Sequence, residues 1–208
     1  MYELTMDVPE FFEYGDEIFK FVAQISYSIV ASGVFYYFTV YCREKQKKEL
    51  FQKTINVKCM SIENAMNRIF NVLIDIKVGN NLDWKNLKNE TIEQRCMEVH
   101  FYDLCGIEGG VCGEYNYLEF FGGECLYLSR IINEIFLKIS EYMEAEELQI
   151  LQEIADCQFV KTMINDYEQK NYINNFYYNN PAFASRKKYF IELYELKKKY
   201  NDVIAHRL

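Results

Sequence analysis

The feature that most constrains this chain is a run of 22 residues near its start that contains no charged side chain. It extends from Phe21 to Cys42 and reads FVAQISYSIVASGVFYYFTVYC. As an α-helix it would be about 33 Å long, which matches the roughly 30 Å hydrocarbon core of a bilayer. A helix can carry the run's uncharged polar residues because its backbone hydrogen bonds are internal. The run therefore predicts a transmembrane helix, and the alternative is the buried central helix of a soluble domain.

The two flanks of this run carry opposite charges. Acidic residues dominate before it, and the segment after it contains Arg43, Lys45, Lys47 and Lys48. Basic residues stay on the cytoplasmic side during membrane insertion. We therefore predict an extracytoplasmic N-terminus and a cytosolic chain after residue 43. A secretory signal peptide would have a basic leading flank and a shorter apolar stretch, so the run does not fit one.

One face of the predicted span carries small and polar residues at helical spacing. These residues are Gln24, Ser28, Ala31, Ser32 and Phe35. Small side chains let helices approach closely, and polar ones hydrogen-bond across the contact. The simplest partner of a lone span is another copy of itself, so we expect a homo-oligomer packed through this face. In a ring of copies the same face would line a polar path, whereas a passive anchor would carry these serines incidentally.

Around this span the chain divides into four segments. We expect a short extracytoplasmic or interfacial lead over 1–20, the transmembrane helix over 21–42, a basic juxtamembrane stalk over 43–60 and a cytosolic helical domain over 61–208. The scarcity of Pro (2) and Gly (9) disfavours an all-β fold. The predicted fold class is all-α, with one N-terminal transmembrane helix followed by a helical bundle.

Apolar periodicity predicts the helices of the domain. Ser61 is the expected N-cap of the first, whose apolar stripe runs from Ile62 to Ile76. The second is expected after Asn89 or Thr91, and to carry Ile92, Cys96, Val99 and Leu104. Further helices are expected over 126–143, about 145–171 and about 182–206. The last is basic, and it could contact lipid, the acidic part of the domain or an oligonucleotide; a solvated face is the alternative.

A stretch rich in Gly and Cys interrupts this pattern. Residues 105–125 hold six of the nine glycines, which predicts turns or a short hairpin. Its candidate ligand loop comprises Cys105, Gly109, Gly110 and Cys112. The stretch lacks the Gly-Lys-Ser/Thr of a P-loop and contains Glu108 and Glu114, so phosphate is not the expected ligand. Ordinary turns are the alternative.

The seven cysteines, an odd number, are expected to be free thiols in a reducing cytosol. Cys96, His100, Cys105 and Cys112 offer soft metal ligands in one stretch, but no CxxC pair accompanies them. Cys96 and His100, four residues apart, could share a helix face, and Cys96 as a core residue is the alternative. We therefore expect no metal, cofactor or catalytic residue. The net charge of −8 argues against a general nucleic-acid-binding protein.

The N-terminal arrangement, GVFYYFTVY followed by REKQKK and a helical domain, resembles a known class of proteins. These are short bacterial single-span membrane effectors of anti-phage, or abortive-infection, systems. The layout is similar to that of the Hailong-type effector, a membrane channel gated by a nucleotide-derived signal. The likeness covers residues 18–50 in motif and the remainder only in architecture. It implies an inner-membrane protein that alters permeability when its domain senses a nucleotide or oligonucleotide made by a neighbouring enzyme.

Two other functions are compatible with the same sequence. The first is a membrane-anchored adaptor that recruits a cytosolic partner through the helical domain. The second is an anchored hydrolase that depends on a cysteine or a metal.

Overall fold

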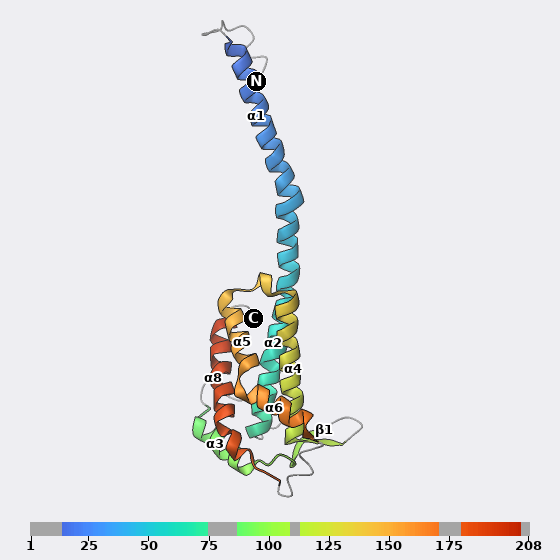
Figure 1. The fold of residues 1–208 in the computed structure, drawn as a ribbon, viewed down its shortest axis with the longest axis vertical. Helices are drawn as coiled ribbons and strands as arrows, with labels where there is room; N and C mark the ends of the chain where they lie inside the picture. Colours follow the sequence, from blue (N-terminus) through green and yellow to red (C-terminus); the bar gives the residue numbers. More distant parts are fainter. Residues whose placement is uncertain (1–13, 75–86, 109–112, 171–179, 205–208) are drawn as a thin grey trace. The chain divides into compact units, whose positions relative to one another are not determined.

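The computed structural model describes residues 14–74, 87–108, 113–170 and 180–204. These residues are mostly helical, as predicted (Figure 1). Their contacts divide the chain into two compact units, Met1–Leu50 and Phe51–Leu208. The predicted lead over 1–20 lies partly outside the described residues.

The first unit is one long helical segment. Helix α1 spans Gly15–Tyr36, and the π-helix η2 spans Tyr37–Tyr41. Helix α2 spans Cys42–Ile74, and its residues up to Leu50 belong to this unit. No side chain in α1 or η2 is buried. The expected helix over 21–42 is therefore present, with a π turn at its end.

The second unit is a helical bundle with one small hairpin. It contains the rest of α2, α3 (Asn89–Glu98), α4 (Tyr117–Lys138), α5 (Ala145–Asp156), α6 (Gln158–Glu168) and α8 (Lys187–Ile204), with the 3-10 helices η4 (Ser140–Tyr142) and η5 (Phe183–Arg186). Strands β1 (Leu104–Glu108) and β2 (Glu114–Asn116) pair antiparallel. The second helix, expected after Asn89 or Thr91, begins at Asn89, and the expected hairpin is present, so the fold is helical with one β exception.

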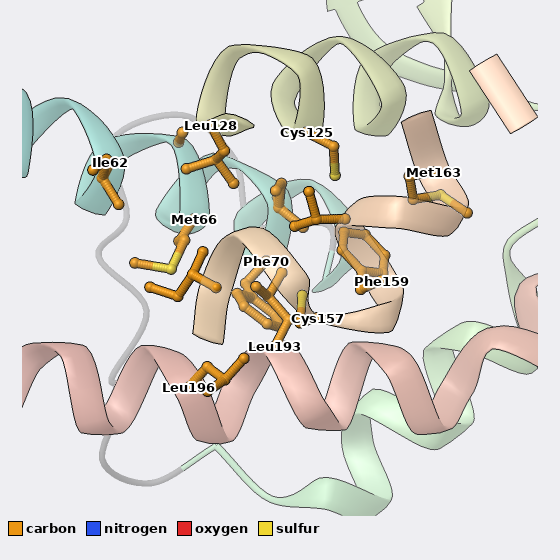
Figure 2. Packing of buried hydrophobic residues seen from close by; sticks show 14 of the residues in the cluster. Ile62, Met66, Phe70, Cys125, Leu128, Cys157, Phe159, Met163, Leu193 and Leu196 are labelled. Carbon is orange, nitrogen blue, oxygen red and sulfur yellow. The ribbon is translucent and has the colours of Figure 1, made fainter. Parts of the chain in front are cut away.

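The hydrophobic core of this unit draws on α2, α4, α6 and α8. Figure 2 shows Met66 and Phe70 of α2 near Leu193 of α8, with Phe159 of α6 close by. Helix α4 packs on α6, and α5 packs on α8. Each fully buried side chain of this size contributes about 1.5–3 kcal/mol. The bundle therefore has a core of its own.

The first helix of the bundle does not begin at Ser61. Helix α2 is unbroken there, and the Ser61 hydroxyl donates to the Val57 carbonyl oxygen one turn back at 2.9 Å. Ile55 and Cys59, inside the expected stalk, are fully buried. These two side chains extend the stripe of Ile62 towards the N-terminus at helical spacing, and the Lys- and Glu-rich sequence before them favours helix. The core therefore starts before residue 61.

Three other boundaries differ from the predictions. Helix α4 begins at Tyr117, not Leu126, because the Asn116 side chain accepts from the Glu119 backbone N–H at 2.8 Å and caps it. The expected helix over 145–171 is two helices, since Cys157 has an extended backbone conformation. The last helix starts as η5 and becomes α8. Val99 and Leu104, expected on the second helix, lie beyond its end: Val99 has an extended backbone and Leu104 lies in β1.

Candidate functional site

The candidate site is the apolar helix of the first unit. Its large side chains are exposed, including Phe21 (63%) and Phe35 (69%). Within the described part of the chain, it is the one helix long and apolar enough to cross a membrane. No side chain of the run's helical part, α1 and η2, is buried against the protein. A central core helix would be buried, so the structure does not support that alternative.

The predicted polar face lies open along α1. Gln24, Ser28 and Ser32 line a shallow groove with Phe21, Ile25 and Ile29. Ala31 and Phe35 are exposed on the same helix but do not line this groove. The Ser28 hydroxyl donates to the Gln24 carbonyl oxygen at 3.0 Å, so it needs no partner from another helix.

A second hydroxyl on α1 behaves in the same way. Ser26 Oγ donates to the Val22 carbonyl oxygen at 2.8 Å. The Gln24 amide, in contrast, forms no side-chain hydrogen bond with any described residue. The Ser32 hydroxyl likewise forms no hydrogen bond with a described residue, so on the predicted face Gln24 and Ser32 have donors and acceptors left for a neighbour or for water.

Sequence reasoning missed the π-helix η2. Its residues Tyr37 and Tyr41 have stacked rings with centroids 5.4 Å apart, and Phe38 meets Tyr37 edge-on at 5.4 Å. The Thr39 hydroxyl donates to the Phe35 carbonyl oxygen at 2.6 Å. A π turn adds one residue to the helical turn and often marks a functional position. The dense aromatic run YYFTVY identifies the place, but no pattern in it predicts the turn type.

The basic residues after the span lie in the first turns of α2. Arg43, Lys45, Lys47 and Lys48 are all exposed. None of them forms an ion pair with a described residue. Their charges are therefore available to anionic lipid headgroups, which attract each Lys or Arg with about 1 kcal/mol.

Only part of the candidate ligand loop can be placed. Cys105 is half-buried in β1, and burial is the main cause that raises the pKa of its thiol. Gly109, Gly110 and Cys112 lie outside the described residues. Gly106 and Gly113 flank them with φ of +71° and +92°, a conformation that favours glycine. Gly106 and Gly113 are therefore needed for the backbone conformation of the hairpin, whereas Gly122 and Gly123 of the same stretch lie inside α4.

The described Cys and His residues of the candidate metal-binding stretch do not form a cluster. Cys96 is fully buried in α3, and burial raises the pKa of its thiol to about 12. His100 lies beyond the end of α3, where its backbone forms an isolated antiparallel β-bridge with Ala182. Cys96 and His100 therefore do not share a helix face. Within the described residues, no three His, Cys, Asp or Glu side chains are placed to hold a metal ion. Cys96 is a core residue.

The basic residues of the C-terminal segment contact acidic side chains of the bundle. Arg186 pairs with Asp166 at 3.0 Å, and Lys187 pairs with Glu93 at 2.8 Å. Lys199 approaches Glu153 at 3.4 Å. For these three residues the predicted contact with acidic side chains of the domain is present.

Sequence reasoning also missed the buried Lys197. Its exposed fraction is 1%, and burial lowers its pKa to about 8, while the Glu63 carboxylate acts in the opposite direction. The signal was available, because Lys197 lies four residues after Leu193 and three before Tyr200 on the buried face of α8. The run of three lysines at 197–199 conceals this position.

Searches of protein-family models, curated proteins and solved structures found no match to this chain.

Proposed function

We propose that this chain is a single-span protein of the bacterial inner membrane, with its N-terminus outside and the bundle in the cytosol. The supporting observation is a helix without one buried side chain, from Gly15 to Tyr41, followed by four exposed basic residues. Leaving a large apolar side chain in water costs about 1.5–3 kcal/mol relative to burial, and lipid tails remove that cost. The basic flank favours retention on the cytoplasmic side.

Membrane fractionation tests the insertion. The full chain should float with lipid in a density gradient and stay in the pellet after an alkaline carbonate wash. Replacing Ile29 and Val30 with lysine places two charges at the centre of the span, each costing about 2.5–3.5 kcal/mol there. This variant should lose most of its membrane fraction. A wild-type chain that remains monomeric in a detergent-free supernatant would contradict the proposal.

Reporter fusions test the orientation. A green fluorescent protein at the C-terminus should fluoresce, and alkaline phosphatase at the same place should be inactive, since this enzyme needs the periplasm. Changing Arg43, Lys45, Lys47 and Lys48 together to glutamate should reduce the fluorescence, because the charge bias of the flanks is removed. Active phosphatase at the wild-type C-terminus would reverse the proposed orientation.

Within the membrane, the proposed role is that of a homo-oligomeric, non-enzymatic effector that alters permeability in anti-phage defence. Its support is the resemblance of residues 18–50 and the open face with Gln24, whose amide can meet a neighbour or water. The proposed trigger is a nucleotide or oligonucleotide sensed by the cytosolic domain. Two states of that domain with different ligand affinities are required for such gating.

Two matched serines test the polar face. Ser28 and Ser26 make the same backbone hydrogen bond, but Ser26 lies about 200° around the helix from Gln24. Ser28→Leu should reduce the membrane depolarisation caused by overexpression, measured with a potential-sensitive dye, and Ser28→Leu with Ser32→Leu should reduce it further. Ser26→Leu should leave it unchanged. Equal effects of Ser28→Leu and Ser26→Leu would contradict a permeation face, and wild-type protein that never depolarises cells would favour a tethered adaptor.

A further inference from the structure

A second groove runs along the first unit, closer to the C-terminal end of the segment than the groove of Gln24, Ser28 and Ser32. Its lining includes Gly33 of α1, Tyr37 and Tyr41 of η2, and Cys42, Lys45 and Glu49 of α2. We infer that this groove is the packing surface for the same segment of a second, parallel copy of the chain. The inference rests on the proposed membrane insertion, which makes the copies parallel, and it assigns their contact to a face that sequence reasoning did not select.

The π turn is what places these residues on one side. In an unbroken α-helix, Glu49 would lie about 160° around the axis from Gly33, on nearly the opposite side. The extra residue of a π turn takes away about 100° of rotation, which leaves about 60°. Glu49 and Lys45 therefore line the same groove as Gly33 and Tyr37. The groove exists because η2 interrupts the α-helix.

The part of the groove formed by α1 and η2 allows another helix to approach closely. A Cβ added at Gly33 would have no neighbour within 4 Å, so the backbone is open to a partner at this point. The stacked rings of Tyr37 and Tyr41 form an apolar wall next to it. Helices in membranes pack most closely where small residues lie beside larger ones.

The part of the groove formed by α2 carries one positive and one negative side chain, so it is complementary in charge to the same surface of a second copy. Lys45 and Glu49 are exposed, and neither forms an ion pair with a described residue. In a parallel pair with two-fold symmetry, Lys45 of each copy lies one helical turn, about 6 Å along the axis, from Glu49 of the other, so these long side chains can pair across the contact. Arg43, Lys47 and Lys48 do not line the groove, and packing through their sides would bring like charges together. A second copy of the chain is therefore the occupant that this groove fits.

The native Cys42 gives a direct test, because it lies in the groove. The probe is the full chain in membranes with Cys105→Ser and Cys112→Ser, which removes these two thiols as competitors of Cys42. Cys59, Cys96, Cys125 and Cys157 are buried and can stay. Copper-phenanthroline and dissolved oxygen remove one proton and one electron from each of two Cys42 thiols, and the sulfurs join as a disulfide. We expect a dimer band that disappears with reductant and is lost in Cys42→Ser.

A displaced cysteine and a charge swap provide the controls. Cys42→Ser with Glu44→Cys moves the thiol about 200° around the helix and should abolish the dimer band. Lys45→Glu should reduce the band strongly, and Lys45→Glu with Glu49→Lys should restore it. No dimer from Cys42, equal dimer from Glu44→Cys, or an unaffected band in Lys45→Glu would overturn the inference.

Flotation of the same samples separates the two proposals. A chain that floats with lipid but forms no Cys42 dimer overturns the groove and leaves the membrane proposal standing. A chain that does not float overturns the membrane proposal, and with it the parallel arrangement on which the groove depends.

Discussion

Lys197 is a cation in the interior of the bundle, on the same face of α8 as Leu193 and Tyr200. The Tyr200 hydroxyl donates to the Cys59 carbonyl oxygen at 2.8 Å, which joins α8 to α2 close to this lysine. Burial favours the neutral amine and lowers the pKa of Lys197 from 10.5 to about 8. Glu63 on α2 favours the charged form and reduces the shift. The folded state therefore bears a cost whenever Lys197 is protonated.

Replacing Lys197 with methionine should remove this cost. At pH 7 the amine is protonated in both the folded and the unfolded state, so we expect Lys197→Met to unfold with a free energy about 2 kcal/mol higher than wild type. Between about pH 8 and 10.5 the folded wild type is neutral while the unfolded chain still binds the proton, so wild type gains stability and the difference closes. Urea unfolding of both proteins at pH 7 and pH 10 measures this.

The comparison with the variant is needed because other groups titrate in the same range. Burial raises the pKa of the Cys157 thiol to about 11 and that of Cys96 to about 12, so both proteins lose stability above about pH 9 as these thiols ionise in the unfolded chain. That loss is common to both and cancels in the difference. A difference that stays constant from pH 7 to pH 10 would show that Lys197 is not the titrating group.

Among the elements, helices α4 and α6 approach each other closely at Gly122. A Cβ at Gly122 would lie 2.4 Å from the Tyr167 Cβ of α6 and 2.7 Å from its Cγ. Gly123, the next residue of α4, has nothing within 4 Å of its Cβ position. Glycine is unfavourable inside a helix by about 1 kcal/mol relative to alanine, so one of these two glycines has a packing reason and the other has none.

The adjacent pair gives a matched test. Gly122→Ala should destabilise the bundle by about 1–3 kcal/mol, because α6 must move away from α4. Gly123→Ala should stabilise it by about 0.5–1 kcal/mol through helix propensity alone. Thermal unfolding followed by circular dichroism measures both. The same sign of change for the two variants would mean that Tyr167 does not set the spacing of these helices.

The elements also show which parts of the fold the sequence can predict. The position of α3 follows from its apolar periodicity together with Asn89, at which the helix begins. Most of α8 follows from apolar periodicity alone. The glycine pair in α4 is typical of a turn, although Asn116 and Glu119 have the spacing of an N-cap and its third helical residue, which favours a helix start at Tyr117. The break at Cys157 has no Gly or Pro beside it, and the apolar period continues through it. Tertiary packing decides such a break, so local sequence does not reveal it.

For the molecule as a whole, the charge-free run was sufficient to locate the candidate site but not its faces. Its lack of charge predicts an exposed apolar helix, which the structure has. The groove of Gly33 and Glu49 could not be predicted, because a regular helix puts these residues on nearly opposite sides and only the π turn brings them together. The boundary of the core was also hidden, since Ile55 and Cys59 lie within a basic, polar segment.

The division into two units predicts how the chain can be cut. All of the described core residues lie between Ile55 and Ile204, and Phe51 stacks on Tyr142 with ring centroids 4.4 Å apart. Residues 51–208 alone should therefore be a soluble monomer with a cooperative thermal transition, as measured by light scattering and circular dichroism. Residues 61–208, cut at the end of the predicted stalk, lack Ile55 and Cys59 and should lose about 3–5 kcal/mol or fail to fold. Equal stability of the two fragments would show that the core begins at residue 61 after all, and aggregation of residues 51–208 would show that the bundle depends on the apolar helix.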